Sequence, residues 1–271
     1  MAKISNADRH LYSEKIRPYQ AAIKALLKRE ELALQIIKKS ARGAALKRLA
    51  LSEEMISLTA NYIIMNGISQ SVLKLRGEEA LNDGRKSLYK AVIYLEEVVS
   101  PLVDVPFSDY EERLEEIHTV DALKRYNIIR KMGLSLQLLE NAYGDRTKWK
   151  WSFVELEGRF AAVAKNIMDL KTAVANTDPS AEDYEPTMYH LRMMKKLLMQ
   201  AADRYREKYE LSTNRIDDFK MGIHFLNSLR RIHALLGERE NAETLKKKVD
   251  IWSSKLEKDT KKQEEAALKR I

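Results

Sequence analysis

Few side chains in this sequence could carry catalysis or bind a metal, and those few are scattered. Cysteine is absent, which excludes disulfides, thiolate nucleophiles and cysteine-ligated zinc. The chain has five histidines, and they are His10, His118, His190, His224 and His233. No two of them have the His-x-x-x-His spacing that presents two zinc ligands on one face of a helix. The sequence therefore offers no zinc site of a recognised pattern.

One short motif does match a metal-binding pattern. Glu115 and His118 form a Glu-x-x-His sequence, which supplies two ligands from one helix in di-iron helical bundles. Such a site needs a second copy of the motif and two further glutamates, and the sequence has no second copy. Nucleophile elbows, phosphate-binding loops and dinucleotide fingerprints are absent as well. We therefore predict no metal, no cofactor and no catalytic residues, in a protein that is not an enzyme.

Two tryptophans, Trp149 and Trp151, stand two residues apart. Residues with this spacing point about 200° apart on a helix, so both cannot face one core if both are helical. One interpretation is that each tryptophan packs against a different neighbouring helix. The other is that one lies on the surface and anchors a protein partner, because tryptophan is enriched at binding hot spots.

Positive charge is concentrated at the start of the chain. The net charge is +8, and residues 1–50 account for all of it, with twelve lysines and arginines against four acidic residues. A polarised charge of this kind says more about partners than the total charge does. The candidate contact residues in this segment are Lys24, Lys28, Lys38 and Arg42.

The basic segment has three interpretations. The charges can be simply solvated, they can dock an acidic partner protein, or they can bind nucleic acid or an anionic membrane surface. The acidic partner could be a second copy of the chain, through Asp104, Asp109, Glu111, Glu112, Glu115, Glu116 and Asp121. Against nucleic acid, the sequence has no recognised binding motif and no basic–aromatic stacking platform. Against a curved membrane-binding coiled coil, glycine and proline interrupt the helices too often.

The elements that must position these residues are all predicted to be helices. Glycine (9) and proline (5) are scarce, while good helix formers are abundant. Apolar residues recur at helical spacing, as in the stripe Ile129, Met132, Leu136, Leu139 and Tyr143. No alternating strand pattern of useful length occurs. We predict an all-α protein of about seven to nine helices, built from antiparallel helical hairpins in a bundle or short solenoid.

Glycine and proline also indicate where these helices begin and end. Pro18 is tolerated in a first helical turn, so the stretch before it can form a separate short helix. Gly67 follows Asn66 in a C-cap signal. Gly84 is costly inside a helix, so we expect the helix that contains it to begin only near Arg85. A later helix is expected from Asp145 to about residue 176.

The clearest loop is residues 177–186, with two prolines, four acidic residues and no basic residue. We place a subdomain boundary there. The predicted parts are a basic N-terminal helical subdomain (1–100), a central helical subdomain (101–178), C-terminal helical hairpins (186–256) and a charged helical tail (257–271).

One segment resembles a known family. Large and small residues of residues 220–254 stand near the spacing of a tetratricopeptide hairpin, at Leu226, Leu229, Leu236, Gly237, Ala242 and Val249. The segment departs from that pattern at Arg230, where a small residue is expected, and at Lys246, where a large aromatic is expected. No second copy follows. The resemblance implies a protein-interaction scaffold.

These observations predict a cytoplasmic protein, because no secretory signal and no apolar span of about 20 residues occurs. The predicted function is a non-catalytic helical scaffold or adaptor that binds other proteins, alone or within a larger assembly. The alternative is binding of nucleic acid or an anionic membrane surface through residues 1–50. A weaker third candidate is a helical-bundle enzyme whose site is built from residues distant in the sequence.

Overall fold

The computed structural model describes residues 4–145 and 147–268, and every regular element in those ranges is a helix. This confirms the predicted all-α class. The chain forms two compact units. The first unit contains the chain up to Val99 together with Arg113–Val120 and Asn127–Lys150; the second contains Ser100–Glu112, Asp121–Tyr126 and the chain from Trp151 onward.

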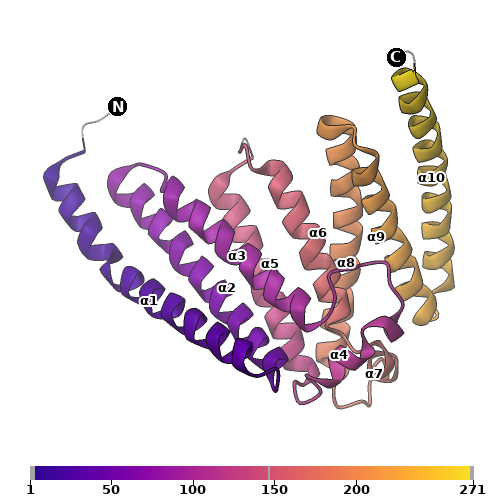
Figure 1. Cartoon of the computed structure of the whole chain (residues 1–271), viewed down its shortest axis with the longest axis horizontal. Coiled ribbons are helices and arrows are strands. Elements are labelled where there is room, and N and C mark those ends of the chain that lie inside the picture. Colours follow the sequence, from indigo (N-terminus) through magenta and orange to yellow (C-terminus); the bar gives the residue numbers. More distant parts are fainter. Residues whose placement is uncertain (1–3, 146, 269–271) are drawn as a thin grey trace. The chain divides into compact units, whose positions relative to one another are not determined.

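Three long helices make up most of the first unit, and α2 packs against both of the others (Figure 1). They are α1 (Asn6–Lys39), α2 (Ala44–Ile68) and α3 (Glu78–Val98), followed later in the chain by α5 (Ala122–Tyr143). Gly43 separates α1 from α2 with a backbone φ of 66°, a left-handed conformation that glycine adopts without steric cost. This glycine therefore allows the chain to leave α1 and enter α2.

The start of α1 differs from the prediction. Ser5 and Asp8 form a reciprocal capping box at its N-terminus, and the helix then continues through Pro18 without interruption. Proline lacks the N–H group that would bond to the preceding turn. Side chains on both sides of Pro18, Ile16 and Ile23, are buried, so apolar packing holds the two parts of the helix in one line.

Two glycines expected at helix ends instead lie inside helices. Gly67 belongs to α2, which passes into a π-helical turn at Ser69–Leu73. Gly84 belongs to α3, where a Cβ atom would lie 3.3 Å from the Cβ atom of Tyr62 and 3.4 Å from a methyl group of Leu139. The missing side chain lets α3 approach its neighbours closely, so packing outweighs the low helix propensity of glycine.

The second unit contains the remaining long helices. They are α6 (Lys150–Asn166), α8 (Tyr184–Lys208), α9 (Ile216–Leu235) and α10 (Arg239–Leu268), with α8 packed on α9 and α9 on α10 (Figure 1). Its shorter elements are the 3-10 turn Phe107–Asp109, α7 (Leu170–Ala175) and the π-helical turn Tyr209–Thr213. The short helix α4 (Glu111–Glu115) has residues in both units. Apolar side chains of the second unit form one cluster, which includes Leu198, Phe219, Leu226 and Trp252.

The prediction of one helix from Asp145 to about residue 176 is wrong in extent. Helix α6 begins only at Lys150 and ends at Asn166. The chain then breaks, and the Asp169 carboxylate caps α7 by accepting a hydrogen bond from the Lys171 N–H group at 2.9 Å. The acidic segment 177–186 lies within the second unit.

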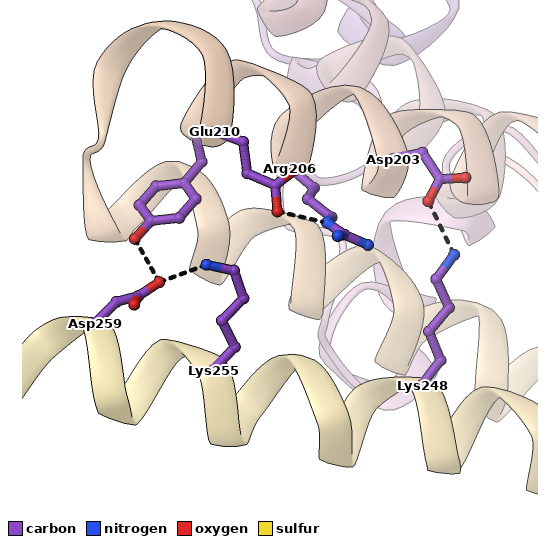
Figure 2. Close-up of polar contacts among 7 residues, drawn as sticks. Asp203, Arg206, Glu210, Lys248, Lys255 and Asp259 are labelled. Carbon is purple, nitrogen blue, oxygen red and sulfur yellow. Dashed lines mark hydrogen bonds and ion pairs between the residues drawn. The ribbon is translucent and has the colours of Figure 1, made fainter.

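Polar side chains join α10 to α8 and to the turn that follows α8 (Figure 2). Lys248 donates to Asp203 at 2.9 Å, and the Tyr209 hydroxyl donates to Asp259 at 2.9 Å. Lys255 also donates to Asp259, at 2.7 Å. The segment predicted as a charged helical tail, 257–271, is part of α10 as far as Leu268. Its last three residues lie outside the described part.

Two glycine substitutions test this account of the packing. Gly158 is buried in α6, and a Cβ atom there would lie 2.5 Å from a ring carbon of Tyr205. We expect Gly158→Ala to lower the free energy of unfolding by about 1–3 kcal/mol. Gly67→Ala meets nothing within 4 Å and should raise it by up to about 1 kcal/mol. Urea unfolding measures both, and a Gly158→Ala protein as stable as wild type would contradict the close packing.

Candidate functional site

The first helix is held to its unit by one face. Four side chains of that face are buried, and they are Ile16, Ile23, Leu26 and Glu30. The Glu30 carboxylate accepts hydrogen bonds from the Lys90 ammonium at 2.9 Å and from the Tyr94 hydroxyl at 2.6 Å, both on α3. Burial and this hydrogen bond raise the pKa of Tyr94. Because a buried carboxylate must keep its partners, these contacts fix the rotation of α1 about its axis.

The opposite side of α1 carries a row of exposed cations, which we name the basic face: Arg17, Lys24, Lys28 and Lys39. At 100° per residue they fall within about 60° of arc and extend over about 33 Å. None of them forms an ion pair within residues 4–145 and 147–268. The basic face is therefore a row of exposed cations without an ion-pair partner in the described part of the chain.

The other two predicted basic contacts lie beside this row. Lys38 is exposed on the flank of α1, and Arg42 is exposed in the link that follows the helix. Large apolar side chains are exposed on α1 as well, among them Leu32 and Ile36, the latter at 51 %. The exposed surface of α1 therefore combines cations with aliphatic groups.

A cavity of about 560 Å³ opens next to the basic face, and Lys24 belongs to both. It is bounded by α1, α2 and the beginning of α3, all in the first unit. Its lining residues are Tyr12, Gln20, Ile23, Lys24, Leu27, Tyr62, Met65, Gly77, Glu78, Glu79, Ala80 and Asp83. Apolar, aromatic and charged groups of both signs thus meet in one space.

The two tryptophans are both half-buried, in different surroundings. Trp149 precedes α6 in a turn, and the Arg85 guanidinium lies 3.9 Å from the centre of its ring. Trp151 is in α6 and packs against the apolar cluster of the second unit. Since Trp149 is not helical, the helical angle between the two residues does not apply.

The second unit contains a buried polar group that was not predicted from the sequence. Lys165 is 3 % exposed, and its ammonium donates to the carbonyl groups of Val103 at 3.0 Å and Val105 at 3.3 Å. Burial, reinforced by the charge of Arg231, lowers the pKa of Lys165 to about 8. The only sequence signal was a lysine four residues after Ala161, on the apolar side of the helix.

The neighbours of Lys165 show what this group does. Asn166 donates to the carbonyl groups of Ser100 at 2.7 Å and Leu102 at 2.9 Å. Asp104 accepts from His224 at 3.1 Å and pairs with Arg231. These contacts fasten the connector after α3 to α6 and α9. A lysine enclosed in this way is closed to a substrate, so the arrangement is structural.

The two residues of the metal-binding motif, Glu115 and His118, make a local contact. The His118 ring lies 2.7 Å from the Glu115 carbonyl oxygen of its own turn. Within the described residues, no three histidine, aspartate or glutamate side chains are grouped so that they could hold a metal ion. No helix within residues 4–145 and 147–268 is long and apolar enough to cross a membrane.

Fold and surface together define an all-α protein with an exposed basic helix at its N-terminal end. The family follows from a sequence model: the TP0443 family matches residues 8–260, and the chain belongs to that family. No curated protein and no solved structure matches it. The segment that resembles a tetratricopeptide hairpin does form a hairpin, α9 and α10, but its helices span residues 216–268, well beyond the 34-residue unit of that family.

A buried histidine makes stability sensitive to acid. His190 is enclosed in α8, with its Nε2 2.8 Å from the Ala164 carbonyl oxygen, and burial lowers its pKa to about 4. The unfolded chain binds this proton near pH 6.5, whereas the folded chain binds it only near pH 4. The stability is therefore fully present above pH 6.5 and is lost as the pH falls through about 4. Between pH 7 and 4.5 we expect wild type to lose about 2 kcal/mol more than His190→Gln. Urea unfolding tests this, with exposed His10→Gln as the control that should behave as wild type.

Lys165 should act at the other end of the pH range. Its folded pKa, about 8, is below the usual 10.5, so the unfolded chain binds more protons between these values and stability rises with pH. From pH 7 to 9.5 we expect wild type to gain about 2 kcal/mol relative to Lys165→Met. Equal pH slopes for the two proteins in chemical denaturation would show that Lys165 is not buried as described.

Proposed function

We propose that this chain is a non-catalytic helical scaffold that binds an acidic protein partner through the basic face of α1. One observation carries the proposal: the cations of the basic face are exposed and unpaired within the described residues. Cations elsewhere in the first unit do find acids, as Arg29 does with Glu54 at 2.6 Å and Lys131 with Glu53 at 3.0 Å. The cations of the basic face are thus available to pair with a partner of opposite charge.

The composition of the surface favours protein over nucleic acid. Protein interfaces combine apolar groups with a polar rim, and Leu32 and Ile36 supply exposed apolar area on the same helix. Single-stranded nucleic acid is held by cations together with aromatic stacking platforms. The tyrosines of α1, Tyr12 and Tyr19, are half-buried and lie away from the basic face.

The burial of α1 argues against a membrane surface. An amphipathic helix binds a bilayer by placing its apolar stripe among the lipid chains. The apolar stripe of α1 includes Ile16, Ile23 and Leu26, which are buried in the first unit. Membrane binding by this mode would require α1 to leave its place in the fold.

The scaffold part of the proposal is supported by the hairpin architecture. Long helices packed as neighbours, such as α8, α9 and α10, present extended and rigid faces at low conformational cost. The tetratricopeptide-like spacing at 220–254 fits such a role in binding proteins. A cytoplasmic location and a larger assembly are consistent with the same proposal.

Reversing charge on the basic face tests the proposal. We expect Lys24→Glu/Lys28→Glu to abolish partner binding, because two attractions become repulsions. In extract from the source cells, a zero-length carbodiimide should couple the Lys24 and Lys28 amines of the wild-type chain to aspartate or glutamate of a partner, identified by mass spectrometry. The charge-reversed protein should lose that partner, and coupling should weaken as salt rises.

The chain offers a matched control on another helix. Lys246→Glu/Lys247→Glu reverses two exposed charges on α10 and should keep the partner. DNA, RNA and phosphatidylserine vesicles form the competing arms. Binding of one of these that is lost in Lys24→Glu/Lys28→Glu, without any coupled protein, would replace the proposal by nucleic-acid or membrane binding.

A further inference from the structure

The cavity beside α1 has charged walls of opposite sign. Lys24 lines it from α1, and Glu79 lines it from the first turn of α3. Each of these two side chains is without an ion-pair partner in the described ranges, so they lie too far apart to pair with each other. The lining of one cavity therefore includes a cation and an anion that are not paired with each other.

The other acids of the cavity are already engaged. Glu78 is paired with Arg76, and Asp83 with Lys86 at 2.9 Å. Glu79 is therefore the carboxylate free to meet a ligand. Burial and the charges of Asp83 and Glu79 raise the pKa of Tyr62, another lining residue. The carboxylates of Asp83 and Glu79 place negative charge on the α3 side of the cavity, and Lys24 places positive charge on the α1 side.

Apolar groups line the same cavity. Ile23, Leu27 and Met65 supply aliphatic surface, and Tyr12 and Tyr62 supply aromatic surface. The cavity volume of about 560 Å³ falls in the range of about 300–1,000 Å³ that is usual for small-molecule sites. The space is thus large enough for a ligand of a few residues, and its lining offers both apolar and charged groups.

We propose that this cavity binds a small apolar zwitterion, an amino acid or a short peptide with both termini free. The ligand carboxylate pairs with Lys24, its ammonium group pairs with Glu79, and its apolar side chains lie on Ile23, Leu27 and Met65. Charge-assisted hydrogen bonds at both ends fix the orientation, while burial of the side chains supplies most of the affinity.

Isothermal titration with leucine and the dipeptide Leu-Leu tests the site. We expect saturable one-to-one binding of at least one of them to the full chain. The N-acetylated and the C-amidated forms each lack one terminal charge. Each should bind at least about tenfold more weakly than the zwitterion. Absence of saturable binding by both zwitterions, or equal affinity for the blocked forms, would overturn the proposal.

Paired variants assign each charge. Lys24→Met should weaken the zwitterion but leave the amidated form unchanged, because that form has no carboxylate to lose. Glu79→Gln should weaken the zwitterion but leave the acetylated form unchanged. Lys15→Met and Glu31→Gln remove exposed charges of α1 that do not line the cavity, and both should bind as wild type. A uniform loss across all four variants would show a general charge effect and no site.

This inference does not depend on the proposed protein partner. Lys28 belongs to the basic face and does not line the cavity, whereas Glu79 lines the cavity and is on α3. A defect of Glu79→Gln in zwitterion binding with normal partner coupling therefore supports the cavity alone. Loss of partner coupling in a Lys28→Glu protein that still binds the zwitterion supports the basic face alone.

Discussion

The buried carboxylate of Glu30 fixes what the first helix presents to solvent. It is 5 % exposed and would be strongly unfavourable without its contacts to Lys90 and Tyr94. Because these two partners lie on α3, the contact ties α1 to a helix that is not its neighbour in sequence. The side of α1 that faces inward is thereby set, and the direction of the basic face and the α1 wall of the cavity follow from it.

Helical periodicity accounts for how much of the fold could be predicted. Ile129, Met132 and Leu139 recur at helical spacing and are all fully buried in α5, so the sequence alone located that packing face. Glycine was a less certain guide, because its meaning depends on the backbone. Gly144 ends a helix at a φ of 72°, whereas Gly84 lies inside one where a neighbouring helix comes close. Only the tertiary contact distinguishes these two uses of the same residue.

The candidate sites were predictable to different degrees. Clustered charge in residues 1–50 was visible in the sequence, but the pairing of Arg29 with Glu54 and the freedom of Lys28 were not. The cavity could not have been found, because Lys24 and Glu79 are far apart in the chain and line the same space only through packing. Lys165 was hidden for a similar reason: its acceptors are backbone carbonyl groups of a distant connector, which leave no mark on side-chain composition.

The two proposed sites share one cation, and this sharing has a thermodynamic consequence. A ligand carboxylate bound at Lys24 would neutralise part of the potential that draws an acidic partner to the basic face. An acidic partner engaged with Lys24 would equally reduce its attraction for the carboxylate, since coupling between two binding events is reciprocal. The effect acts through a single ammonium group and requires no movement of α1. A small molecule could in this way regulate assembly by charge alone, with Glu30 holding both surfaces in place.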